Sequence, residues 1–309
     1  MYQCENEISI MRRLLALCII GKAVLYVDNI RAVIVDDSSV SIAIINEIFE
    51  HHGFEVVGTA GSLKEVKKVV KDTKPNLVTM DISLPDADGF ECIRAIHEID
   101  PTIKVIVVSS MMDDGSIGEA YQHSVSSYIQ KPIEEEDLLN AINEIKTDDE
   151  MFNTLQKEYL EVFKKSFEDG YARMVKGSFS YESNSVFDKE LTSEDIVIVV
   201  GIVGKFSGKM VLMLPRQVSV ALSDAFLKRA PKDDEELSDI LTEFANIISG
   251  SACSTLNRKN GAYNLRLAPP SIMIGPYICI SPPNFTMHTA IANTDFGKIL
   301  LNIGFKRGI

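Results

Sequence analysis

The chain has 309 residues and a formal net charge of −13 at pH 7. This length is sufficient for two domains that each bury a core of their own. Lysine and arginine are dispersed through an acidic sequence, which argues against a basic surface for nucleic acid phosphates. The five cysteines lie far apart and form no CxxC pair, a pattern that favours reduced thiols in a cytoplasmic protein over a disulfide scaffold.

Residues 1–29 precede the first predicted strand. Residues 11–20 imitate a signal peptide, with a basic start and an apolar core, but the apolar run is too short to span a bilayer and Lys22 interrupts it. We expect an over-long gene start or an ill-ordered extension, with a peripheral membrane or packing segment as the alternative. We do not expect this part of the chain to be a membrane span.

Residues 30–146 show five strand-like runs that alternate with five helical segments. The predicted strands cover residues 32–35, 56–58, 76–80, 105–108 and 127–130. The predicted helices cover residues 40–53, 63–72, 90–98, 117–123 and 134–145. Strict alternation of strand and helix is typical of a doubly wound α/β domain with a parallel sheet.

Polar side chains follow the ends of four of these strands. Asp36 and Asp37 follow the first strand and Asp81 follows the third, while Ser109 and Lys131 follow the fourth and fifth. Ligands of open α/β sheets bind at this edge, so we expect these groups to converge. Two carboxylates about 4 Å apart repel by about 4 kcal/mol at an effective dielectric constant near 20. The acidic group is therefore expected to hold a hard divalent cation, with Mg2+ as the default.

This set of residues resembles the receiver domain of two-component response regulators, the family of the chemotaxis protein CheY. The resemblance implies a flavodoxin-like (βα)5 fold in which Asp81 accepts a phosphoryl group. It also implies that Mg2+ is held by carboxylates and one carbonyl, from Asp36, Asp37, Asp81 and Ser83. A histidine kinase of the CheA type would donate the phosphoryl group.

The same resemblance implies three residues that sense the phosphoryl group. Ser109 and Lys131 would contact the phosphoryl oxygens, and Tyr128 matches the aromatic residue that switches position. Two positions depart from CheY, because Ser83 and Met111 stand where CheY has Asn and Glu. Both positions are thought to tune how long the phosphoryl group persists, so its lifetime in this chain stays open.

Residues 147–309 have a different organisation. The charged run 146–150 is expected to be the seam between the domains, followed by an amphipathic helix from residue 151 to about residue 170. Strands are predicted at 196–203 and 208–214, at 271–274 and 277–280, and at 288–292 and 299–305, with helices at 217–228 and 237–256 and an acidic link at 231–236. Paired hairpins with a few helices predict an α+β domain.

The helix at 237–256 carries a polar face. At about 100° per residue, Asp239, Glu243, Asn246 and Gly250 fall opposite the apolar side. Periodicity alone indicates a solvated face. A glycine within the helix costs about 1 kcal/mol relative to alanine and permits another backbone to approach closely.

Residues 241–252 resemble the Glu-x-x-Asn helix of the CheC, CheX and FliY phosphatases, which dephosphorylate CheY. Residues 201–209 and 270–275 support the resemblance, and the single helix motif is similar to CheX rather than to CheC. The resemblance implies that Asn246 positions the attacking water. It also implies that Glu243 pairs with the lysine of the partner receiver that corresponds to Lys131.

The leading hypothesis is a cytoplasmic signalling protein in which a receiver is fused to a CheX-like phosphatase. Its substrate would be the aspartyl phosphate of a CheY-type receiver, and phosphorylation of Asp81 would regulate it. We expect a homodimer, and neither nucleic acid nor membrane as a partner. Two alternatives stay open: a CheX-like half that only dimerises or docks, and a half that acts on Asp81 of its own chain or dimer partner.

Overall fold

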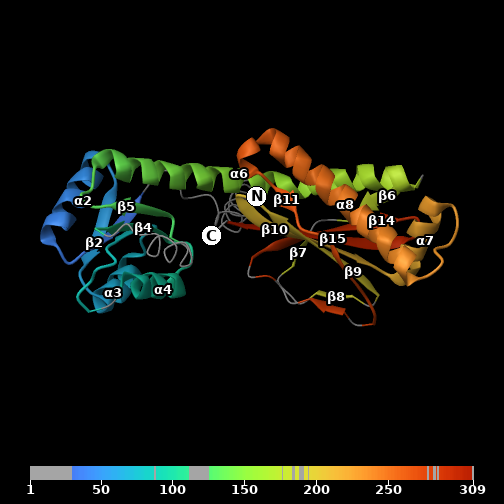
Figure 1. Cartoon of the computed structure of the whole chain (residues 1–309), viewed down its shortest axis with the longest axis horizontal. Coiled ribbons are helices and arrows are strands. Elements are labelled where there is room, and N and C mark those ends of the chain that lie inside the picture. The colour runs from blue at the N-terminus through green and yellow to red at the C-terminus, as the bar shows by residue number, and fades with distance from the viewer. Residues whose placement is uncertain are drawn as a thin grey trace, which may run out of the picture. The chain divides into compact units, whose positions relative to one another are not determined.

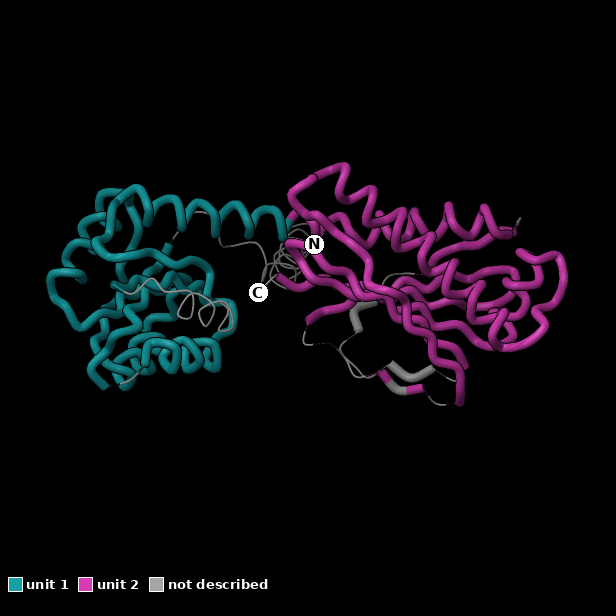
Figure 2. Tube along the Cα trace, in the orientation of Figure 1, with its two compact units in different colours: residues 1–153, 309 teal, residues 154–308 magenta. Residues whose placement is uncertain are grey.

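The computed structural model describes residues 30–86, 88–110, 125–175, 177–182, 185–187, 191–193, 195–276, 278–280, 283 and 285–307. The N-terminal segment 1–29 and the helix predicted at 117–123 lie outside these residues. The chain divides into two compact units, residues 1–153 with 309 and residues 154–308 (Figure 2). The domain boundary at residue 146 stays a prediction.

Unit 1 contains a five-stranded parallel sheet (Figure 1). The strand order is β2-β1-β3-β4-β5, with β1 Arg31–Val35, β2 Glu55–Ala60, β3 Leu77–Met80, β4 Lys104–Ser109 and β5 Ser127–Gln130. Between the strands lie helices α2 Ser39–His51, α3 Leu63–Thr73 and α4 Gly89–Ile99. The predicted doubly wound, flavodoxin-like fold is confirmed.

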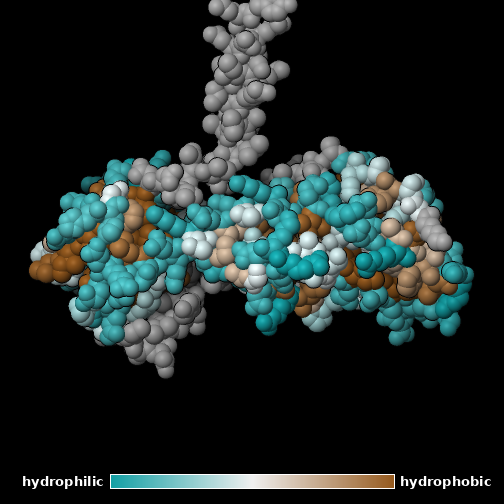
Figure 3. Space-filling view, turned by 90° about the horizontal axis from the view of Figure 1, so that it is seen from above, coloured by the Kyte–Doolittle hydropathy of each residue, from teal (hydrophilic) through white to brown (hydrophobic). Residues whose placement is uncertain are grey.

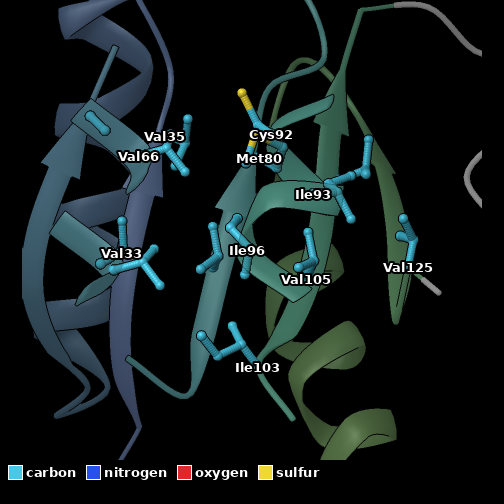
Figure 4. Close-up of a cluster of buried hydrophobic side chains, with 14 of the residues drawn as sticks. Val33, Val35, Val66, Met80, Cys92, Ile93, Ile96, Ile103, Val105 and Val125 are labelled. Atoms are coloured by element: carbon cyan, nitrogen blue, oxygen red, sulfur yellow. The ribbon is translucent and has the colours of Figure 1, made fainter. Parts of the chain in front are cut away.

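Apolar side chains cover both faces of this sheet. Alternate residues of β1 face opposite sides, so that Val33 and Val35 join one cluster while Ala32 and Ile34 join another. The first cluster contains residues of α3 and α4, and Figure 4 shows it around Met80 and Val105. The second contains residues of α2 and of the helix that follows β5. Burial on both faces explains why these strands are continuous apolar runs.

Helix α6 runs from Glu135 to Met174, 40 residues without a break. The two helices predicted at 134–145 and from 151 to about 170 are therefore one helix, because the charged run 146–150 contains no helix breaker and is itself helical. Two contacts hold it within unit 1. Lys104 pairs with Asp149 at 3.2 Å, and the Lys146 ammonium lies 5.1 Å from the centre of the Phe54 ring.

Unit 2 contains an antiparallel sheet of eight strands. Its main order is β11-β9-β10-β15-β14-β6, with β11 Arg266–Leu267, β9 Ile196–Val203, β10 Phe206–Leu214, β15 Gly297–Arg307, β14 Met287–Thr294 and β6 Phe179–Tyr181. β12 Ser271–Ile274 also pairs with β9, β7 Ser185–Phe187 pairs with β14, and β8 Leu191–Ser193 with β13 Ile278–Ile280 forms a separate pair. The hairpins β9–β10 and β14–β15 and the α+β class are confirmed.

Two further helices belong to unit 2, α7 Arg216–Leu227 and α8 Asp234–Lys259. The acidic link predicted at 231–236 is shorter than expected, because Asp233 caps α8 by accepting a hydrogen bond from the Glu236 amide at 2.8 Å. Acidic residues in a first turn also favour the positive end of the helix dipole. None of the helices in the described ranges combines the length and apolar character needed to cross a bilayer.

A buried stripe on α6, aromatic except for Leu155, forms the centre of the unit 2 core. It consists of residues spaced by four, all fully buried: Leu155, Tyr159, Phe163, Phe167 and Tyr171. The Phe167 ring lies 5.6 Å from Phe244 of α8 and 5.9 Å from Phe179 of β6, measured between centroids. The stripe therefore joins α6 to both α8 and the sheet.

Removing the Phe167 ring from this stripe is expected to destabilise unit 2. Phe167→Ala leaves a cavity where three elements meet, so the free energy of unfolding should fall by about 3–5 kcal/mol. Urea denaturation of the full chain measures this change. Phe226→Ala is the control, because that ring is 44 % exposed and its loss should cost far less. Equal losses in the two variants would contradict this account of the core.

Candidate functional site

Three carboxylates converge at the carboxyl edge of the parallel sheet. Asp36, Asp37 and Asp81 each place an oxygen within 4.8 Å of the other two. The convergence follows from strand register, because Val35 of β1 pairs with Met80 of β3 and each is followed by an aspartate. Asp36 is 1 % and Asp81 is 5 % exposed, whereas Asp37 is open to solvent.

Turns of the backbone orient the two buried carboxylates. The Ser38 amide donates to Asp36 Oδ1 and the Ser83 amide donates to Asp81 Oδ1, both at 2.8 Å. Ser38 also caps α2, so the turn that holds Asp36 begins the helix. Each aspartate thus keeps its second oxygen available to another group.

Lys131 bridges these second oxygens. Its Nζ donates to Asp36 Oδ2 at 2.8 Å and to Asp81 Oδ2 at 2.6 Å. Burial lowers the pKa of this ammonium, but the hydrogen bonds to Asp36 and Asp81 outweigh burial and raise the pKa above its ordinary value. Among the described residues, Lys131 is the one cation paired with this group of three carboxylates, so the site can still attract a further positive charge.

Ser109 and Tyr128 lie on the next two strands of the sheet. Ser109 ends β4 and is fully buried, and its carbonyl accepts a hydrogen bond from the Lys131 amide at 2.8 Å. Tyr128 on β5 is half-buried and packs against the apolar cluster that includes Met80. Met111, the second departure from CheY, lies outside the described residues.

The loop after Asp81 has a constraint that the sequence reasoning missed. The helix predicted at 90–98 begins at Gly89, and Asp88 caps it. A Cβ at Gly89 would lie 2.4 Å from the Ile82 Cα and 2.7 Å from the Asp81 carbonyl oxygen. The N-terminus of α4 therefore packs directly on the loop that follows Asp81. The Asp-Gly pair before an apolar helical run was the available signal.

This donor set fits a hard divalent cation. All three side chains offer carboxylate oxygen, the ligand that Mg2+ prefers, and two of them are buried and fixed by backbone hydrogen bonds. The participation of the Ser83 carbonyl stays a prediction.

Helix α8 separates an apolar side from a polar ridge. Leu241, Phe244 and Ile248 are fully buried, whereas Glu243 is exposed and Asn246 is half-buried. Among the described residues, the side chains of Glu243 and Asn246 have neither a hydrogen-bond partner nor an ion-pair partner. Seen from this side, the surface of unit 2 carries both hydrophilic and hydrophobic side chains (Figure 3). A carboxylate and a carboxamide are thus presented side by side without a structural use in their own domain.

Comparison with known families identifies both halves of the chain. The model of the response regulator receiver domain matches residues 32–143, and the model of the chemotaxis phosphatase CheX matches residues 196–291. The chain belongs to the response regulators and joins a receiver to a CheX domain. The matched ranges contain every candidate residue of the receiver site and both Glu243 and Asn246.

Individual relatives resemble one half each. The receiver is 34 % identical to the chemotaxis protein CheY of Thermotoga maritima over 115 residues, 37 % of this chain and 96 % of that protein. A chemotaxis protein CheX from Desulfovibrio desulfuricans is 22 % identical, with 48 % of this chain and 99 % of that chain covered and a TM-score of 0.45. A chain of a CheX-CheY-BeF3-Mg2+ complex from Borrelia burgdorferi is 26 % identical, covers 38 % of this chain and 88 % of that chain, and has a TM-score of 0.37.

Removing one carboxylate of the receiver site is expected to abolish stabilisation by Mg2+. A ligand at a hundredfold excess over its Kd stabilises the native state by about 2.7 kcal/mol, and Asp37→Asn should lose most of this gain. The variant without metal should be at least as stable as wild type, because one like charge is removed from the group. Thermal denaturation with and without Mg2+ measures both effects.

Asp72→Asn serves as the control for this comparison. Asp72 is an exposed aspartate of α3 outside the acidic group. Its substitution therefore removes the same charge and leaves the site unchanged. Its melting temperature should respond to Mg2+ as wild type does. A full Mg2+ response in Asp37→Asn would show that the three carboxylates do not form the metal site.

Proposed function

We propose that the CheX domain hydrolyses the aspartyl phosphate of a CheY-type receiver and that the receiver of this chain regulates this activity. The observation that carries the proposal is the unpaired Glu243 and Asn246 on the open ridge of α8, inside the range matched by the CheX phosphatase model. The proposed setting is the cytoplasm, and the proposed assembly is a homodimer.

The reaction requires a water molecule in line with the acyl phosphate bond. The water oxygen forms a bond to phosphorus, the bond to the aspartyl oxygen breaks, and the products are inorganic phosphate and a carboxylate. The Asn246 carboxamide can both donate to and accept from this water, which fixes its position. It is not a strong base, so its contribution is orientation, a recognised source of several kcal/mol.

Glu243 is proposed to secure the docked receiver. It lies one turn from Asn246, on the same side of α8, and its exposed carboxylate would pair with the lysine that corresponds to Lys131. In the receiver of this chain, that lysine already contacts two aspartates at 2.8 and 2.6 Å. The ion pair between Glu243 and this lysine would lie beside the acyl phosphate bond. It would thereby align Asn246 with that bond.

The receiver of this chain is proposed as the regulatory input. Asp81 would accept the phosphoryl group from a CheA-type histidine kinase, and Asp36, Asp37, Asp81 and the Ser83 carbonyl would hold Mg2+. Bound Mg2+ supplies neutralisation of the phosphoryl charge. Ser109 and Lys131 would then contact the phosphoryl oxygens, and Tyr128 would shift its position in response. The output follows as a population shift between two receiver conformations.

Loss of the carboxamide tests the catalytic role. Asn246→Ala should lower the rate of phosphate release from a phosphorylated CheY-type receiver by about a hundredfold, because the water is no longer oriented. The melting temperature should stay close to wild type, since the side chain makes no bond to the described residues. Ser254→Ala, an exposed position on the same helix, should release phosphate at the wild-type rate.

The same variants separate the alternatives. Equal rates for wild type and Asn246→Ala would leave docking or dimerisation as the role of the CheX domain. If Asn246→Ala instead preserves the phosphoryl group on Asp81 of its own protein and changes nothing in trans, the domain resets its own receiver. Autodephosphorylation of the full chain, followed alongside the assay in trans, distinguishes these outcomes.

Removing the phosphoacceptor tests regulation. Wild type preloaded with a small-molecule phosphodonor should differ from untreated wild type in kcat/KM toward the separate substrate receiver, by about 5-fold to 150-fold, the range of typical coupling energies. Asp81→Asn should show one value under both treatments, because it cannot be phosphorylated. Identical kinetics of treated and untreated wild type would contradict a regulatory role for the receiver.

A further inference from the structure

Gly250 lies on the polar ridge of α8, one turn beyond Asn246. It is half-buried and occupies the interior of a helix that continues to Lys259. A glycine at such a position makes a helix less stable than an alanine would, since it adds backbone entropy without any side-chain contact. Its presence therefore calls for a reason, either in the packing of the domain or in something that binds to it.

Packing within the described part of the domain does not require this glycine. A Cβ at residue 250 would meet a single atom within 4 Å, Leu267 Cδ1, at the ordinary contact distance of 3.9 Å. Two glycines of the unit 2 sheet differ sharply. A Cβ at Gly208 would lie 2.6 Å from the Phe305 ring, and one at Gly304 would lie 2.4 Å from the Thr286 carbonyl oxygen. Those glycines are demanded by the fold, and Gly250 is not.

The proposed reaction supplies the missing reason. An aspartyl phosphate is recessed at the edge of its sheet, as the receiver of this chain illustrates, where the exposed fraction of Asp81 is 5 %. Asparagine has a short side chain, so its amide reaches such a recess only if the backbone of α8 comes against the surrounding loops. A side chain at residue 250, on the C-terminal side of Asn246, would hold this part of α8 away from the docked loop.

We propose that Gly250 is the position at which the main chain of a docked receiver, in a loop beside its acyl phosphate, packs directly on α8. This inference rests on the proposed phosphatase function and names a residue that sets the closeness of docking. Leu267, which is half-buried, lies beside Gly250 and would contact the same loop.

Adding a side chain at residue 250 tests the inference, because the stability of the chain should rise while its phosphatase activity falls. Gly250→Ala should raise the melting temperature of the full chain by about 2–4 °C. It should lower kcat/KM for a phosphorylated CheY-type receiver by about tenfold or more, mainly through KM, since overpacking of a close contact is costly. Gly250→Leu should extend the loss.

Binding gives a readout that does not depend on turnover. The affinity for a receiver loaded with beryllium fluoride and Mg2+, measured by calorimetry, should weaken by about tenfold or more in Gly250→Ala. Gly261→Ala is the matched control, because a Cβ there also meets nothing within 4 Å and the residue lies beyond the end of α8. This control should leave affinity and kcat/KM unchanged.

The outcomes separate the inference from the function on which it rests. If Asn246→Ala loses activity while Gly250→Ala binds and turns over like wild type, the inference is wrong and the phosphatase function stands. A fall in the melting temperature of Gly250→Ala would also overturn the inference, because the fold itself would then need the glycine. If neither variant changes phosphate release, both the inference and the function fail.

Discussion

The bridge from Lys131 to Asp36 and Asp81 is the interaction on which the receiver site depends. Adjacent parallel strands of this register force two buried carboxylates together, and such a pair is unfavourable without a positive charge between them. Lys131 supplies that charge from the end of β5. The same arrangement leaves Asp37 exposed at the rim. A site of this kind is stable at rest and still has oxygen ligands for a second cation.

The two sides of α8 have different roles. Phe244 and Ile248 anchor the helix in the core, and Phe244 meets the aromatic stripe of α6 through Phe167. The apolar side of α8 supplies the packing, so the polar ridge is not needed to hold the helix in place. Glu243 and Asn246 therefore need no partner in their own domain. Rigid anchoring also matters for the proposed chemistry, since an orienting amide is effective only if its helix does not move.

The sequence was most informative where one physical rule acted locally. Strands buried on both faces are continuous apolar runs, so β1, β3 and β4 were predictable, as were the aspartates that follow β1 and β3. Glu243 and Asn246 were different, because periodicity alone indicates only a solvated face, and the resemblance to CheX was needed to single them out. The unbroken path of α6 was missed, since its charged run is held by Phe54 and Lys104, partners that are distant in sequence. The need for glycine at residue 89 was missed for the same reason, because it comes from the packing of α4 on the loop after Asp81.

The contrast between the two halves also explains why the proposed catalytic site is so small. A receiver must hold a doubly charged group, which takes buried carboxylates, a lysine and a metal. A phosphatase that acts on such a receiver does not need to provide positive charges of its own, because the lysine and metal of the substrate already stabilise the transferred phosphoryl group. What it must add is geometry: one amide beside the water, one carboxylate to set the register, and a surface that comes close enough. Two polar side chains and a glycine on one well-anchored helix meet that requirement, and a larger cluster of charges on α8 would only compete with the groups that the receiver brings.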